Sequence, residues 1–138
     1  MKHRALIVGA GRIGAGFRWH DDEYTHAGAY LALKDRVELV GFVEPNEERA
    51  VAAEEKWKLP VYKTIKEAPH VDIVSVCTQP EDQEKVFKEY ANRVGVYYYC
   101  EKPYLGGSPS PHHTQVNFLR RGDPFHQKIA NLIDVKCS

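Results

Sequence analysis

Short runs of apolar residues recur along the chain, and each is bounded by turn-forming or polar residues. The first, at residues 5–8, ends at glycines and is rich in β-branched side chains, which is typical of a strand buried on both faces. Similar runs predict strands at residues 37–43, 72–76 and 94–100, with a weaker candidate at 115–119. Because these runs lack polar alternation, they indicate a parallel sheet covered on both sides.

Segments with helical spacing of apolar residues separate these runs. Asn46 is a suitable N-cap for one helix, Pro80 suits the first position of a second, and Asp123-Pro124 predicts the start of a third. The apolar stripes of these three helices are Ala50, Ala53 and Trp57; Val86, Phe87 and Tyr90; and Phe125, Ile129, Leu132 and Ile133. Strands that alternate with helices imply right-handed β-α-β crossovers. We therefore predict an α/β fold, a doubly wound parallel sheet of the Rossmann type.

Composition excludes several classes of partner. Lys plus Arg and Asp plus Glu each number 19, so the chain has no general attraction for nucleic acid or an anionic membrane. The cysteines, Cys77, Cys100 and Cys137, have neither disulfide-framework nor zinc-site spacing, so no metal is expected. The apolar run after the basic start stops at Gly9, too short for a signal peptide or a membrane span. We expect a cytoplasmic protein.

The sequence Gly-Ala-Gly-Arg-Ile-Gly follows the first predicted strand directly. The spacing of Gly9, Gly11 and Gly14 is that of a turn whose backbone amides and following helix N-terminus bind a pyrophosphate. We expect Gly9 to make the turn, Gly11 to leave room for the ligand and Gly14 to let helix and strand pack closely. We also expect Arg12 and Ile13 to contact the cofactor, although a surface arginine more often faces water.

Glu44 follows the second predicted strand, where a carboxylate accepts hydrogen bonds from the adenosine ribose. It lies further from the glycines than the usual spacing of about 20 residues, because residues 17–26 extend the first crossover. The alternative is a solvated turn carboxylate. A carboxylate there would repel the 2′-phosphate of NADP, and Pro45 and Asn46 supply no cation, although Arg49 could swing back. NAD is therefore favoured over NADP.

Four more motifs accompany the glycine turn and Val43-Glu44-Pro45-Asn46. They are Thr-His-Ala-Gly-Ala-Tyr at residues 25–30, Cys-Thr-Gln-Pro at 77–80, Cys-Glu-Lys-Pro at 100–103 and Asn-Phe-Leu-Arg-Arg-Gly-Asp-Pro at 117–124. In this order the motifs resemble those of the Gfo/Idh/MocA oxidoreductases, over residues 5–105 and again over 115–133. Members of that family typically oxidise or reduce sugars, inositols or sugar nucleotides with NAD(P).

The resemblance implies roles for four residues. Lys102 matches the lysine of the family's Glu-Lys-Pro motif, which contacts the nicotinamide ribose and substrate and helps to move the proton, and is our one catalytic candidate. Glu101 matches its cofactor-side neighbour, and Thr78 and Gln79 match residues that line the nicotinamide side. Without the resemblance, Lys102 would be an ordinary surface lysine before a proline, and Thr78 a helix N-cap.

The sequence also departs from the family pattern. Gln83 stands where the family usually has a histidine, so one ligand contact is altered, and only residues 105–114 replace a full helix after Glu-Lys-Pro. We expect this chain to lack the family's second domain, which binds substrate. His26 could approach the ligand or cap and pack the helix at 27–34. We assign no catalytic role to His112, His113 and Asp134 as substitutes for residues of that domain, because loop histidines and an acid on a terminal helix are more often solvated.

These observations define the expected function. We assign residues 1–120 to a dinucleotide-binding domain and residues 121–138 to a linking helix and the start of the missing domain. We expect a truncated relative of a dehydrogenase for sugar or sugar-nucleotide carbinols, which binds NAD with little or no turnover alone. The alternative is a non-catalytic interaction or regulatory protein. In either case, the surface left by the missing domain is available for self-association or a partner chain.

Overall fold

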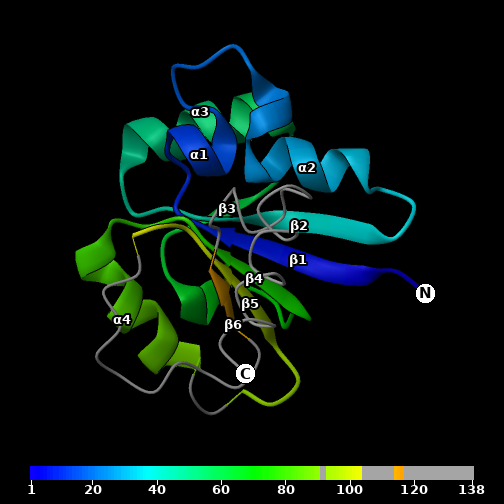
Figure 1. Ribbon diagram of the computed structural model, residues 1–138. Helices are drawn as coiled ribbons and strands as arrows, with labels where there is room; N and C mark the ends of the chain where they lie inside the picture. The colour runs from blue at the N-terminus through cyan, green and yellow to red at the C-terminus, as the bar shows by residue number, and fades with distance from the viewer. Residues whose placement is uncertain (91–92, 104–113, 117–138) are drawn as a thin grey trace, which may run out of the picture.

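The computed structural model describes residues 1–90, 93–103 and 114–116. Within them, six strands form one sheet in the order β3-β2-β1-β4-β5-β6, and all neighbours pair in parallel (Figure 1). The strands are β1 (His3–Val8), β2 (Val37–Val43), β3 (Val61–Tyr62), β4 (Ile73–Val76), β5 (Tyr97–Cys100) and β6 (Thr114–Val116). The strand order reverses between β1 and β4, which is the switch point of a doubly wound sheet. The predicted fold class is confirmed.

Helices cover both faces of this sheet. They are α1 (Arg12–Ala15), α2 (His26–Ala32), α3 (Glu47–Trp57) and α4 (Pro80–Tyr90), with 3₁₀ turns at Asp22–Tyr24 and Ile65–Glu67. Figure 1 shows α1, α2 and α3 on one face of the sheet and α4 on the other. In the described parts of the chain, no helix has both the length and the apolar character that crossing a membrane requires.

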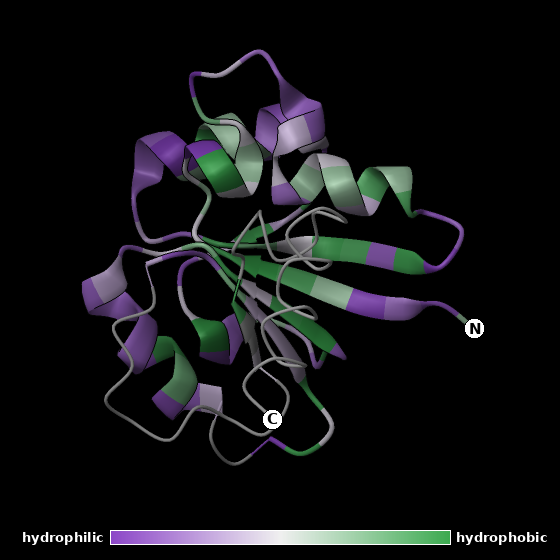
Figure 2. Cartoon of the chain, in the orientation of Figure 1, coloured by the Kyte–Doolittle hydropathy of each residue, from purple (hydrophilic) through white to green (hydrophobic). Residues whose placement is uncertain are grey.

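Two hydrophobic clusters hold these layers together. Leu6 and Val8 of β1 belong to the cluster under α4, whereas Ile7 belongs to the cluster under α1, α2 and α3. Residues 5–8 are thus buried on both faces, as their apolar run predicts. Figure 2 shows apolar colour along most of β1 and β2 and polar colour in the connecting loops and on parts of α3 and α4. The stripe of Val86, Phe87 and Tyr90 on α4 is likewise buried.

Local signals explain most element boundaries. The Asn46 side chain accepts a hydrogen bond from the Arg49 N–H at 3.0 Å and caps α3, as predicted. The strand predicted at 94–100 begins only at Tyr97, because Gly95 has a φ of +79° and turns the chain away from extended geometry. The two-residue strand β3 was not predicted, since so short a run carries no periodicity.

Several predictions fall outside the described residues. Thr114–Val116 overlaps the strand expected at 115–119, and residues 117–119 lie beyond the description. The same holds for most of the 105–114 connection and for the third predicted helix. The individual side chains concerned are His112, His113, Asp134 and Cys137. The proposed division at residue 120 is therefore still a prediction.

Candidate functional site

The residues that follow β1, β2, β4 and β5 lie side by side at one edge of the sheet. Backbone hydrogen bonds of 2.8 or 2.9 Å join Gly9 to β2, Cys77 to β1 and Glu101 to β4. The Glu44 N–H continues this row by donating to β3 at 2.9 Å. This edge holds the carboxyl ends of the strands, where ligands bind in open α/β sheets. The fold thus brings together motifs that are almost 100 residues apart in the sequence.

The three glycines of the turn lie in different environments. A Cβ at Gly9 would lie 2.7 Å from the Cys77 carbonyl group, and its φ of +102° disfavours other residues. A Cβ at Gly14 would collide with the Gly9 carbonyl oxygen. A Cβ at Gly11 would meet no atom of the described residues within 4 Å, and its φ of −79° suits any residue. Packing therefore accounts for Gly9 and Gly14 but leaves open space over Gly11.

Glu44 is joined to this turn by its side chain. Its Oε1 accepts a hydrogen bond from the Ala10 N–H at 3.0 Å, and its Oε2 accepts one from the Asn46 N–H at 3.1 Å. The residue is only 5% exposed, so it is not the solvated turn carboxylate that the sequence left as an alternative. The negative charge is held beside the glycine turn by two backbone donors.

A first cleft of about 710 Å³ opens between the glycine turn and Glu44. Its volume is in the usual range for small-molecule sites, about 300–1,000 Å³. Gly9, Gly11, Arg12 and Ile13 line it, whereas Gly14 is packed against the Gly9 carbonyl and does not. Sequence reasoning missed several lining residues; one of them is Lys63, which follows the unpredicted strand β3.

A second cleft, of about 1,020 Å³, adjoins the first. Its wall includes Glu101 and Lys102 after β5, together with Tyr30 of α2. Thr78 and Gln79, at the start of α4, line both clefts. The residues that the two clefts share are Ile13, Trp19, Cys77, Thr78 and Gln79. A ligand long enough to pass these shared residues would extend from the Glu44 side to the Lys102 side.

A buried polar network forms the floor of the second cleft. His26 is 7% exposed, and its Nε2 lies 2.7 Å from Glu101 Oε1. Its Nδ1 lies 2.9 Å from Ser75 Oγ, which in turn lies 2.7 Å from the Tyr30 hydroxyl. Thr25, rather than His26, caps α2 by accepting the Gly28 N–H at 3.0 Å. The sequence left two roles open for His26. As the first residue of α2 it is held by these polar partners, and it also lines the cleft.

The remaining predicted site residues differ in exposure. Lys102 is exposed at the rim of the second cleft. Thr78 Oγ1 is buried and has no hydrogen-bond partner among the described residues. Gln83 Nε2 donates to the Glu101 carbonyl at 2.9 Å, so this residue supports the backbone before Lys102 and lines neither cleft.

Burial favours the neutral forms of two groups in the second cleft, Tyr30 and Cys77. It raises the pKa of Tyr30 to about 12, although the hydrogen bond with Ser75 acts in the opposite direction. Burial likewise raises the pKa of the Cys77 thiol well above its usual value, and the nearby Glu101 carboxylate acts in the same sense. Cys77 is therefore a neutral wall residue at physiological pH and not a thiolate nucleophile.

Comparison with known proteins places this geometry in context. The model of the Gfo/Idh/MocA oxidoreductase family, described as an NAD-binding Rossmann fold, matches residues 3–109. No curated protein sequence matches the chain. Among solved structures, the WlbA dehydrogenase from Bordetella pertussis, in complex with NADH and UDP-GlcNAcA, is 26% identical with a TM-score of 0.62. That match covers 75% of this chain and 30% of the WlbA chain.

Two further structures extend the comparison. UDP-N-acetylglucosamine 3-dehydrogenase from Acidithiobacillus ferrooxidans is 26% identical, with a TM-score of 0.56 over 75% of this chain and 30% of its own. Scyllo-inositol dehydrogenase from Lactobacillus casei, at 17% identity, shares the fold with a TM-score of 0.71 over 96% of this chain and 41% of its own. The chain thus spans well under half the length of these structures. Since the family model covers most of its residues, the chain belongs to the Gfo/Idh/MocA family of NAD-binding oxidoreductases.

Proposed function

We propose that the two adjoining clefts bind one molecule of NAD(H), with adenosine at Glu44 and nicotinamide beside Lys102. The open space over Gly11 supports this proposal most strongly, because protein packing alone does not require a glycine there. A pyrophosphate in that space would reach the backbone amides at the start of α1. The buried and unpartnered Thr78 Oγ1, between the two clefts, is a second polar group suited to a ligand.

Specificity for NAD over NADP rests on the Glu44 carboxylate. Both of its oxygens are held by backbone N–H groups, so the charge stays beside the ribose position. A 2′-phosphate would be repelled there at short range. Arg49 and Lys63 line the same cleft and soften this repulsion without removing the carboxylate.

The substrate class we propose is a sugar or sugar nucleotide whose carbinol exchanges a hydride with the cofactor. The WlbA dehydrogenase structure is a complex with the UDP-sugar UDP-GlcNAcA, the Acidithiobacillus ferrooxidans enzyme is named for a UDP-sugar, and each is 26% identical to this chain. NAD supplies the hydride acceptor, and Lys102 is positioned at the rim to take the hydroxyl proton. Because the match covers only 30% of each of those two chains, we expect little turnover by these 138 residues alone.

Calorimetric titration of the purified chain with NADH and then NADPH tests the proposal. We expect one NADH per chain and an affinity for NADPH at least about tenfold lower, equivalent to about 1.4 kcal/mol. Addition of NAD with UDP-N-acetylglucosamine should give no steady increase in absorbance at the NADH band. Failure to bind either dinucleotide would overturn the proposal and favour a non-catalytic interaction or regulatory role.

We also propose that the protein is located in the cytoplasm. The two cysteines in the described residues, Cys77 and Cys100, are both free thiols. Burial raises the pKa of Cys100 to about 11, so neither thiol is activated for disulfide exchange. A reducing compartment, where NAD-dependent dehydrogenases commonly act, suits this state.

A further inference from the structure

The segment between α1 and α2 carries a large aromatic side chain into the boundary between the two clefts. Trp19 lines both of them and is half-buried. Its ring belongs to neither of the two hydrophobic clusters that hold the sheet and helices together. An aromatic residue that supports no core and lines a cleft is suited to contact a ligand.

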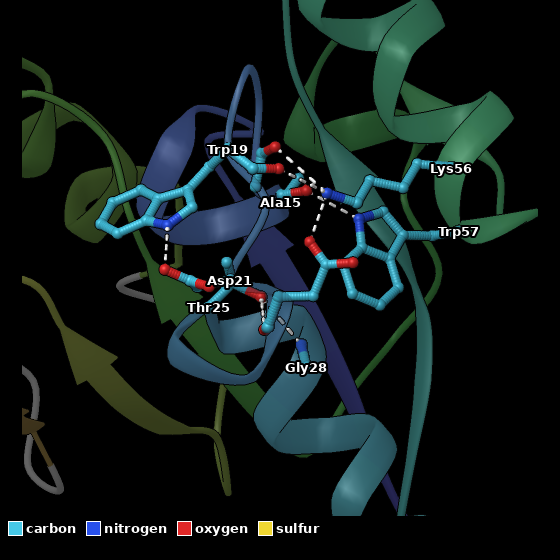
Figure 3. A network of polar contacts seen from close by, with 9 residues as sticks. Ala15, Trp19, Asp21, Thr25, Gly28, Lys56 and Trp57 are labelled. Carbon is cyan, nitrogen blue, oxygen red and sulfur yellow. Dashed lines mark hydrogen bonds and ion pairs between the residues drawn. The ribbon is translucent and has the colours of Figure 1, made fainter.

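This segment is fixed in place by α3. Lys56 Nζ donates to the carbonyl oxygens of Gly16 and Trp19 at 3.2 and 3.3 Å and forms an ion pair with Asp22. Trp57 Nε1 adds a hydrogen bond of 2.8 Å to the Ala15 carbonyl. Figure 3 shows these contacts on one side of the segment and the Trp19 indole projecting from the other. The wall that Trp19 forms is therefore ordered before any ligand arrives.

The orientation of the ring itself is also set by its neighbours. The indole Nε1 donates to Asp21 Oδ2 at 3.2 Å, which satisfies its one polar group. The Arg12 guanidinium carbon lies 5.1 Å from the ring centroid, within the range of a cation–π contact. Because Arg12 begins α1, the ring is coupled directly to the proposed phosphate-binding turn.

We propose that Trp19 is a cofactor-contacting residue that packs against the nicotinamide riboside half of the bound dinucleotide. This inference rests on the proposed function and adds a contact that the motifs do not indicate. Glu44 lines only the first cleft and Lys102 only the second, whereas Trp19 lines both. A dinucleotide with adenosine at Glu44 must pass Trp19 before its nicotinamide reaches Lys102. A planar pyridine ring gains from aromatic packing at that point.

Affinities of Trp19→Ala for NADH and for ADP-ribose, which lacks the nicotinamide, test this assignment. We expect NADH affinity to fall about tenfold, while ADP-ribose affinity changes less than about twofold. Trp19→Phe should retain NADH affinity within about threefold, because it keeps an aromatic face. Tyr97→Ala removes an exposed aromatic at the opposite end of β5 and serves as the matched control, with both affinities unchanged.

Each other outcome counts against the inference. Equal weakening of NADH and ADP-ribose would show that Trp19 acts through the phosphate turn, and unchanged affinity for both would show that it contacts neither. If Trp19→Ala does not give the wild-type melting transition, Trp19→Leu replaces it, with the same expected selectivity for NADH. Wild-type protein that binds neither ligand would overturn the proposed function itself, whereas wild-type binding with an insensitive Trp19 would overturn only this contact.

Discussion

Glu44 illustrates how a side chain proposed to contact the ligand also supports the fold. Its position after β2 was predicted from the sequence, because a carboxylate at a strand end is a local pattern. Its two hydrogen bonds to the backbone of Ala10 and Asn46 were not, since the Ala10 contact joins residues 34 positions apart. The carboxylate therefore anchors the turn as well as standing at the expected ribose position.

Glu44→Gln should lower both stability and cofactor selectivity. The amide keeps one acceptor but directs an NH₂ group toward a backbone donor, so the free energy of unfolding should fall by about 1–3 kcal/mol. The preference for NADH over NADPH should narrow at the same time, since the repelling charge is gone. Urea denaturation and the two titrations measure these effects. Glu38→Gln, an exposed change on the same strand, is the control and should shift stability by no more than about 0.5 kcal/mol.

His26 marks the limit of sequence reasoning at this scale. Its neighbours in the chain left two roles open, a ligand contact or a cap and packing contact of the helix, and they indicated no hydrogen-bond partner. The structure pairs it with Ser75 and Glu101, which are 49 and 75 residues away. Neither periodicity nor a motif encodes such a pair, because it depends on how the fold brings the first residue of α2 to β4 and to the residue after β5. Gln83 is a similar case, since it supports the Glu101 backbone and not a ligand.

His26→Ala should test how much this buried pair contributes. Removal of the imidazole leaves the Glu101 carboxylate and Ser75 hydroxyl without two hydrogen bonds in a buried site. We expect the free energy of unfolding to fall by about 1–3 kcal/mol, as measured by chemical denaturation. A change smaller than about 0.5 kcal/mol would mean that the pair adds nothing to the fold. His20→Ala, at an exposed position in the adjacent segment, is the matched control.

Among the elements, α3 and α4 follow their sequence signals closely, whereas the short ones do not. An N-cap, acidic first turns and apolar stripes are all local, so both long helices were predicted with their buried faces. The four-residue α1 is too short for such a stripe and was expected only from the glycine spacing, whereas the two-residue β3 was not predicted. They form because Gly14 lets α1 pack against the turn and because β2 offers β3 an edge to pair with.

Gly14→Ala should disrupt this helix–turn packing. The added methyl group would collide with the Gly9 carbonyl oxygen, which is backbone and cannot move aside cheaply. Overpacking of this kind costs about 1–3 kcal/mol, so the melting temperature should fall clearly. Thermal unfolding followed by circular dichroism measures the effect. A variant with the same melting temperature as the wild-type protein would contradict the tight packing of α1.

At the scale of the whole molecule, the fold class and family could be predicted because strand–helix alternation and ordered motifs are properties of the sequence. The clefts could not, since their walls combine residues from the first crossover, α3 and the ends of four strands. Trp19 shows this best. Nothing in its local sequence indicates that Lys56, 37 residues later, holds its backbone at the boundary of two clefts.

The central claim is that a dinucleotide lies over Gly11, and Gly11→Val tests it most directly. The space around a Cβ at this position is open and the backbone conformation is allowed, so folding should lose no more than about 1 kcal/mol, from the poorer N-cap. A side chain there would occupy the space in which the pyrophosphate approaches the backbone amides. We predict a melting temperature close to that of the wild-type protein and no measurable NADH binding by calorimetry. A folded variant that still binds NADH with wild-type affinity would contradict the account.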